Sequence, residues 1–300
     1  MKLATTIGDV SQFVDTFEEA VRFYKDTGFK HLDFNFLNVS ENQKKQFLSE
    51  NWKECIINAK TAADELGFDF VQAHAPTCIM RGPEMKKSIE IMLRCIETCG
   101  ILKIENLVIH SGCYAEFKYP EGKNENHKAN EAFLRALIPT LEKFNVNILF
   151  ENTTAKHIDG CYFPITGDDL NDFVSFMNHP NFGTVWDVGH AHLDNLNHKD
   201  EIIKMKNTLR GVHIHDNFAT KDLHLAPFMG TVDFENVIEG LLNIDYSGYF
   251  TFETDGFFDF KILGYEEKRI PQFIELKKDS LKLLYKIGKA LLSKHNIFDE

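Results

Sequence analysis

Eight short segments of apolar and β-branched residues alternate along the chain with longer amphipathic stretches, and this alternation limits the possible folds more than any other feature. The predicted strands are Lys2–Ile7, Lys30–Phe36, Asp69–His74, Asn106–His110, Val146–Glu151, Phe182–Val188, Arg210–His215 and Gly248–Glu253. Eight strand–helix alternations in 300 residues predict an α/β fold, a single (β/α)8 TIM barrel that spans residues 1–300. A doubly wound open sheet is the alternative, and it is disfavoured because no Gly-rich phosphate loop follows the first strand.

The stretches between the predicted strands carry helix signals. Asp15–Thr27 precedes Gly28, which we expect to be a left-handed C-cap. Glu84–Cys99 follows a Gly-Pro pair and has apolar residues at helical spacing, and Thr166 begins a further helix with capping residues. Phe273–Ser293 follows the eighth strand, so it would close the domain.

The bulk composition restricts the class of partner. Hydrophobic residues make up 43% of the chain, enough for a large core, and the net charge is −12. A protein that binds a phosphate backbone usually has a basic face, so nucleic acid is an unlikely partner. The six cysteines form no CxxC pair, and neither a signal peptide nor an apolar membrane span is evident. We therefore expect a cytoplasmic protein that binds no membrane, and a homo-oligomer is possible.

Polar residues gather at the C-terminal ends of the predicted strands. Those expected to point into the barrel mouth are His74, His110, Glu151, Asp187, His213 and Glu253. Alternate strand residues share one face, so Leu149 and Glu151 point the same way, as do Val185 and Asp187. Because active sites of such barrels form at the C-terminal ends of the strands, these side chains would converge on one site.

The acidic side chains in this set predict a metal ion. Carboxylates crowded together and buried would each cost on the order of several kcal/mol unless a cation compensated them. Glu151, Asp187, His213 and Glu253 form an oxygen-rich ligand set that suits one Mn²⁺, Co²⁺, Mg²⁺ or Zn²⁺ ion. For Asp187 the alternative is that its side chain caps the following helix.

Two further histidine-containing segments surround the seventh strand. His213 and His215 alternate on the same face, and either could be the ligand; we favour His213 because His-apolar-x-Asp begins there. Asp222 and His224 lie two residues apart in the next loop and are possible additional metal ligands. An ordinary polar loop is an equally good interpretation of that pair.

Taken together, the motifs HAP, IHSG, ENT, DxGH, HIHDN, DxH and FET resemble those of the xylose isomerase-like barrels, the AP endonuclease 2 type, along nearly the whole chain. This family groups sugar and sugar-phosphate isomerases and epimerases with endonuclease IV. Resemblance to the ketose 3-epimerase branch implies a single metal ion bound by Glu151, Asp187, His213 and Glu253. It also implies that both glutamates are the acid and base, and that His190 contacts substrate oxygens.

The resemblance to endonuclease IV implies a longer ligand set with three Zn²⁺ ions. The matching residues are His74, His110, Glu151, Asp187, His190, His213, Asp222, His224 and Glu253. Two features depart from the nuclease: the loop after DxH reads Pro227-Phe-Met-Gly230 where a Gly-Glu-Gly turn is usual, and the charge is −12. The epimerase branch has an arginine shortly after its strand-seven histidine, whereas here Lys221 is the nearest cation, which leaves the substrate open.

The leading hypothesis is a metal-dependent sugar or sugar-phosphate isomerase or epimerase. Glu151 and Glu253 would transfer the proton through a metal-stabilised enediolate of a small carbohydrate-like substrate. The expected substrate-binding residues are His190, His74, His110 and His215. The alternatives are a dehydratase or lyase that uses the same enolate chemistry, an endonuclease IV-like phosphodiesterase acting on abasic DNA, and a non-catalytic barrel.

Overall fold

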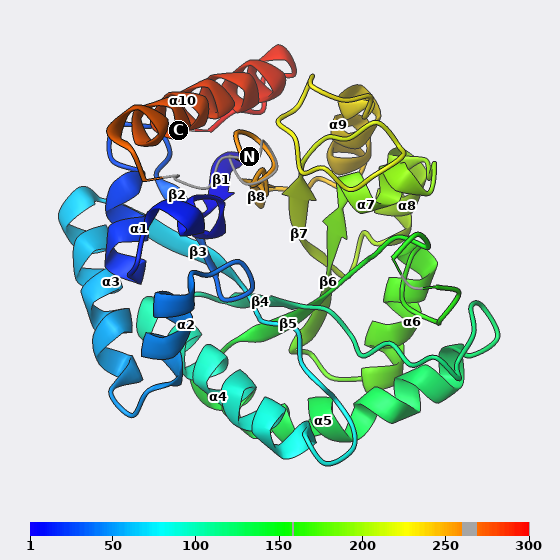
Figure 1. Cartoon of the computed structure of the whole chain (residues 1–300). Coiled ribbons are helices and arrows are strands. Elements are labelled where there is room, and N and C mark those ends of the chain that lie inside the picture. The colour runs from blue at the N-terminus through cyan, green and yellow to red at the C-terminus, as the bar shows by residue number, and fades with distance from the viewer. Residues whose placement is uncertain (158, 260–268, 300) are drawn as a thin grey trace.

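The computed structural model describes residues 1–157, 159–259 and 269–299, which form a closed barrel of parallel strands in sequence order (Figure 1). The strands are β1 (Lys2–Thr6), β2 (His31–Asn35), β3 (Asp69–His74), β4 (Asn106–Ile109), β5 (Asn147–Glu151), β6 (Phe182–Asp187), β7 (Leu209–Ile214) and β8 (Tyr249–Phe252). The barrel closes where β1 pairs with β8, with Lys2 opposite Tyr249. The predicted (β/α)8 barrel is confirmed.

Helices surround the barrel in an outer layer (Figure 1). They are α1 (Phe17–Phe23), α2 (Glu41–Leu48), α3 (Trp52–Leu66), α4 (Met85–Leu102), α5 (Lys123–Phe144), α6 (Gly167–Met177), α7 (Val188–Leu193), α8 (His198–Lys204), α9 (Phe234–Asn243) and α10 (Pro271–Lys294), and a 3₁₀ segment η1 (Ile7–Phe13) follows β1. None of the helices in the described ranges combines the length and the apolar composition that a membrane span requires.

Local signals in the sequence explain several helix boundaries. Thr166 accepts a hydrogen bond from the Asp169 backbone and begins α6 with a capping box, as predicted. The predicted helix Glu84–Cys99 is α4, which continues to Leu102 and ends at Lys103 in the left-handed conformation. Its residues Cys95 and Cys99 lie in the core.

The predicted helix Asp15–Thr27 is too long at both ends. The capping box at Thr16 delays the start of α1 to Phe17, and the helix ends at Phe23, where a tighter turn begins. Thr27 stabilises this turn by donating its hydroxyl to the Tyr24 carbonyl at 2.7 Å. Gly28, which lies beyond the end of the helix at φ 102°, is therefore not its C-cap.

The strands bury both of their faces. Aromatic and aliphatic side chains fill the layer between strands and helices, where Trp186 is fully buried and its indole Nε1 donates to His198 Nδ1 at 3.4 Å. Val108, Leu149 and Val185 form a separate apolar cluster from the inward positions. The inward alternation expected of Leu149 with Glu151 and of Val185 with Asp187 therefore holds.

Replacement of Gly28 by Ala is expected to destabilise the barrel. A Cβ at this position would lie 2.5 Å from the Tyr285 ring of α10, and φ is strained for any L-residue. We expect a loss of about 2–4 kcal/mol in the free energy of unfolding, measured in urea. Gly67→Ala is the control: φ there is 67° and no heavy atom lies within 4 Å of the new Cβ, so its loss should be about 1 kcal/mol. Equal losses would contradict the steric explanation.

Candidate metal centre at the barrel mouth

The four residues predicted to bind a metal ion lie together at the C-terminal end of the barrel. Glu151, Asp187, His213 and Glu253 are all buried, and each offers a ligand atom within 4.8 Å of the others. His213 Nδ1 is 2.8 Å from Glu151 Oε1, 3.4 Å from Glu253 Oε2 and 4.0 Å from Asp187 Oδ2. We refer to these four residues as the carboxylate cluster. The histidine in it is His213, the one favoured from the sequence over His215.

His74 and His110 lie against the same glutamate. His74 Nε2 is 3.0 Å and His110 Nε2 is 2.8 Å from Glu151 Oε2. His74 Nδ1 faces the Ala75 carbonyl at 2.9 Å, so both ring nitrogens of His74 face acceptors. Such a ring is either an imidazolium or a metal ligand through Nε2. His74 and His110 therefore both contact the carboxylate cluster through Glu151. Their role in substrate binding stays a prediction.

A second group of ligand atoms lies beside the carboxylate cluster, and we refer to it as the histidine cluster. It consists of His190, His215, Asp222 and His224. His190 Nε2 and His224 Nε2 each lie 3.2 Å from Asp222 Oδ2. The rings of His215 and His224 stack with their centroids 3.9 Å apart. The loop residues Asp222 and His224, for which the sequence left two readings, thus face other potential ligands.

His215 connects the two clusters. Its Nε2 lies 3.0 Å from Asp187 Oδ1, and its Nδ1 lies 3.8 Å from Asp222 Oδ1. This position requires Gly189 in the DxGH motif, because a Cβ there would lie 1.8 Å from His215 Cε1. The glycine therefore makes room for an imidazole between two acids.

Asp187 is both a cap and a member of the carboxylate cluster. Its Oδ1 accepts the His190 N–H at 2.6 Å and so caps α7, while its Oδ2 faces His213. The two roles that the sequence analysis treats as alternatives are compatible. Since β6 ends at Asp187, Val188 is the first residue of α7 and not the last strand residue.

Two asparagines that the sequence analysis missed fix the strand ends. Asn152 accepts the Asp187 N–H at 2.7 Å and donates Nδ2 to the Asp187 carbonyl at 2.9 Å. Asn217 donates Nδ2 to the Gly189 carbonyl at 2.9 Å. The signal available was position, because each asparagine follows directly after an acidic residue in the motifs ENT and HIHDN.

The charges in the carboxylate cluster are unevenly balanced. Burial raises the pKa of Glu253 to about 7, and its Oε1 is buried without a hydrogen-bond partner in the described part of the chain. Burial also disfavours charge on Glu151, but the neighbouring His213 and His110 hold its pKa well below the ordinary range. Burial opposes the cation of His213, yet Glu253 and Glu151 raise its pKa to about 10. A divalent cation fits these donors, since it would satisfy the unpaired oxygen and the excess negative charge.

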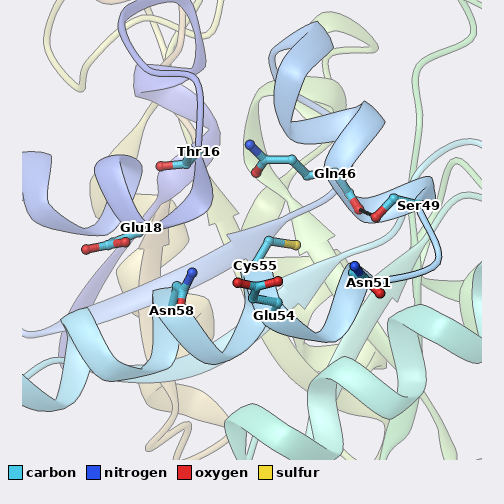
Figure 2. A pocket seen from close by; sticks show the side chains of 8 residues that line it. All are labelled: Thr16, Glu18, Gln46, Ser49, Asn51, Glu54, Cys55 and Asn58. Carbon is cyan, nitrogen blue, oxygen red and sulfur yellow. Dashed lines mark hydrogen bonds between the residues drawn. The ribbon is translucent and has the colours of Figure 1, made fainter.

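A polar groove on the outside of the barrel contains none of the predicted site residues (Figure 2). It lies among α1, α2 and α3, and its lining residues are Thr16, Glu18, Gln46, Ser49, Asn51, Glu54, Cys55 and Asn58. Burial raises the pKa of the Cys55 thiol to about 11, and this thiol donates to the Trp52 carbonyl at 2.9 Å. An un-ionised, hydrogen-bonded thiol is a poor nucleophile, so Cys55 does not make this groove a stronger candidate active site than the barrel mouth.

These features define a parallel (β/α)8 barrel with side chains that could ligate a metal ion at the C-terminal ends of its strands. The chain belongs to the xylose isomerase-like TIM barrel family, whose family model matches residues 11–269. The resemblance inferred from the motifs is confirmed.

Two relatives match part of the sequence. The chain is 28% identical over 192 residues to the uncharacterized protein MJ1311 of Methanocaldococcus jannaschii, covering 61% of this chain and 64% of the relative. It is 33% identical over 177 residues to the uncharacterized protein y4fM of Sinorhizobium fredii, covering 57% of this chain and 54% of the relative. The chain therefore spans less than two thirds of the length of each relative.

Several solved structures share the fold over almost the whole chain. A D-tagatose 3-epimerase-like protein has a TM-score of 0.72 at 21% identity and covers 98% of this chain and 99% of its own. The 3-keto-D-glucoside 4-epimerase YcjR from E. coli has a TM-score of 0.68 at 19% identity, covering 95% and 99%. The IOLI protein with a binding zinc atom has a TM-score of 0.73 at 16% identity, covering 98% and 99%. At these identities the similarity establishes the shared fold.

The affinity for a divalent ion is expected to rise with pH. An ion at the carboxylate cluster displaces protons from Glu253 and His213, whose pKa values are raised to about 7 and about 10. Below pH 7 both residues are protonated, and between the two pKa values only His213 is. The association constant should therefore rise about 100-fold per pH unit below pH 7 and about 10-fold per unit between pH 7 and pH 10. Competition with a chelator for Mn²⁺ measures this, and a constant affinity would contradict the assignment.

Proposed function

We propose that this chain is a metal-dependent isomerase or epimerase of a small sugar or sugar phosphate. The observation that carries the proposal is the carboxylate cluster, in which Glu151 and Glu253 both lie beside His213 at the barrel mouth. Two acidic side chains next to one cation site are what proton transfer at a carbon beside a carbonyl requires. The family membership and the sugar epimerases among the structural neighbours support the same reaction class.

A divalent ion bound by the carboxylate cluster would supply Lewis-acid polarisation of a substrate carbonyl and its neighbouring hydroxyl, which stabilises the enediolate. Glu253 is suited to remove the proton, because one of its two carboxylate oxygens could bind the ion while the other faces the substrate. Burial raises the pKa of Glu253, which makes its carboxylate a stronger base than an exposed one.

Glu151 is the second acid–base group of the proposal. Its Oε2 lies within 3.0 Å of His74 and its Oε1 within 2.8 Å of His213, so it is anionic and firmly oriented. In an epimerase, Glu151 would pass a proton from the neighbouring His74 imidazolium to the opposite face of the carbon, and Glu253 would release the proton it removed to solvent. In an isomerase, the proton held by Glu253 would return to the neighbouring carbon. Imidazoles at the mouth, His190 among them, would donate hydrogen bonds to the hydroxyls of a carbohydrate-like substrate.

A multi-zinc phosphodiesterase is the second candidate function, because of one specific arrangement. His74 and His110 surround Glu151, and the histidine cluster lies beside the carboxylate cluster, so the mouth has more potential ligands than a single ion requires. Three Zn²⁺ ions could use them to bind and cleave a phosphodiester. The net charge of −12 disfavours a DNA substrate.

The number of bound ions distinguishes the two functions. The isomerase is expected to bind one exchangeable Mn²⁺ or Co²⁺ per chain and to catalyse exchange of a carbon-bound proton of a ketose with deuterium from heavy water. Elemental analysis of the purified chain, followed by nuclear magnetic resonance of a ketose panel, measures both. About three tightly bound Zn²⁺ ions with nicking of an abasic duplex would favour the phosphodiesterase instead.

Glu253→Gln is expected to abolish proton exchange. The amide keeps the shape of the side chain but cannot accept the substrate proton, so turnover should fall by at least about 100-fold while the melting temperature of the ion-free protein holds or rises. The matched control is Glu239→Gln on α9, where the carboxylate is exposed and pairs with Lys199 at 2.9 Å. Full activity of Glu253→Gln would refute the acid–base assignment.

A further inference from the structure

Gln72 lies inside the barrel next to the carboxylate cluster. It is buried on β3, two residues before His74, so both side chains point inward. Its side-chain amide lies 2.8 Å from His213 Nε2 and 3.2 Å from Asp33 Oδ2. Asp33, on β2, is fully buried. A line of polar contacts therefore runs from Asp33 through Gln72 to His213 and on to Glu151.

The barrel makes room for this line at Gly211. A Cβ at position 211 would lie 2.7 Å from the Gln72 amide oxygen. The neighbouring inward side chains, Val185 and Leu149, are apolar and would lie within 3.5 Å of the same Cβ. A polar side chain in such surroundings has lost its hydrogen bonds to water, so its protein partners determine how it is oriented.

We propose that Gln72 is a positioning residue of the metal centre, which accepts the Nε2 proton of His213 and so keeps Nδ1 directed at the carboxylates. Nδ1 is the nitrogen that faces Glu151 and Glu253. It can bind an ion only when unprotonated, and the single proton of neutral imidazole then lies on Nε2. The imidazolium that the carboxylates favour before ion binding also carries a proton on Nε2. The hydrogen-bond partner of Nε2 must therefore be an acceptor both in the ion-free protein and in the ion-bound protein.

The amide of Gln72 meets this requirement through Oε1. The amide nitrogen is placed against His213, and a half-turn of the amide exchanges its two ends without moving other atoms. Oε1 would then also face Asp33 Oδ2, and two acceptors repel each other unless the acid carries a proton. Burial raises the pKa of Asp33, although His213 and His74 partly offset this. If Asp33 carries a proton, it would donate to the same oxygen, so both neighbours of Gln72 would donate to it.

Mn²⁺ affinity of the whole chain, without substrate, tests this inference. Mn²⁺ alone is the probe because it prefers the oxygen-rich carboxylate cluster to a site rich in histidine. Loss of an outer hydrogen-bond partner typically weakens metal binding, so Gln72→Leu should bind Mn²⁺ about 10- to 100-fold more weakly than wild type. Gln46→Leu, in the groove of Figure 2, is the control and should bind like wild type. Wild-type affinity in Gln72→Leu would overturn the inference.

A double variant separates this role from a merely structural one. In Asp33→Asn with Gln72→Glu, the amide and the carboxyl group exchange places, so residue 72 can only accept and residue 33 can donate. The double variant should bind Mn²⁺ at least as tightly as wild type. Binding as weak as that of Gln72→Leu would contradict the inference. Thermal melting of each ion-free variant checks that it is folded.

The inference rests on the proposed metal centre and not on the proposed reaction. If the wild-type chain binds no ion, the proposed function fails together with it. If wild type binds Mn²⁺ and Gln72→Leu binds it equally well, only the role of Gln72 is refuted.

Discussion

Mutual repulsion among three buried carboxylates, those of Glu151, Asp187 and Glu253, is the constraint on which the rest of the barrel mouth depends. Each such charge costs on the order of several kcal/mol when buried without a partner. The chain offsets this with imidazoles from the ends of β3, β4 and β7; those within 3.0 Å of Glu151 are His74, His110 and His213. This concentration of buried negative charge is what the proposed cation would offset.

Uncharged contacts then hold the charged groups in place. The Asn152 side chain joins β5 to β6 by two hydrogen bonds to the backbone of Asp187. Gly189 gives His215 its space, and Gly211 gives space to Gln72. These residues contribute no charge, yet a side chain at either glycine would displace a member of the site. In ENT and DxGH, a candidate ligand is followed by a residue, Asn152 or Gly189, that positions another candidate ligand at the end of the next strand.

The sequence was sufficient to predict the fold and most of the side chains that meet at the barrel mouth, and the reason lies in periodicity. A period of two along β5 and β6 places Glu151 and Asp187 inward whatever the details of the loops, and eight parallel strands bring their ends together. Gln72 and Asn152 were missed because a side-chain amide is uncharged and can both donate and accept hydrogen bonds. Its role depends on which residue faces it across the barrel, and the local sequence does not reveal that residue. The 3₁₀ segment η1 was missed because such turns follow from tertiary contacts and caps more than from helical periodicity.

The position of His215 links the two clusters electrostatically. One ring nitrogen faces Asp187 and the other faces Asp222, while the ring stacks on His224. His215 therefore belongs to the histidine cluster through Asp222 and contacts the carboxylate cluster through Asp187. The proposed single-ion and multi-ion sites are for this reason not independent of each other. The imidazole that orients Asp187 for the first site is itself a candidate ligand of the second.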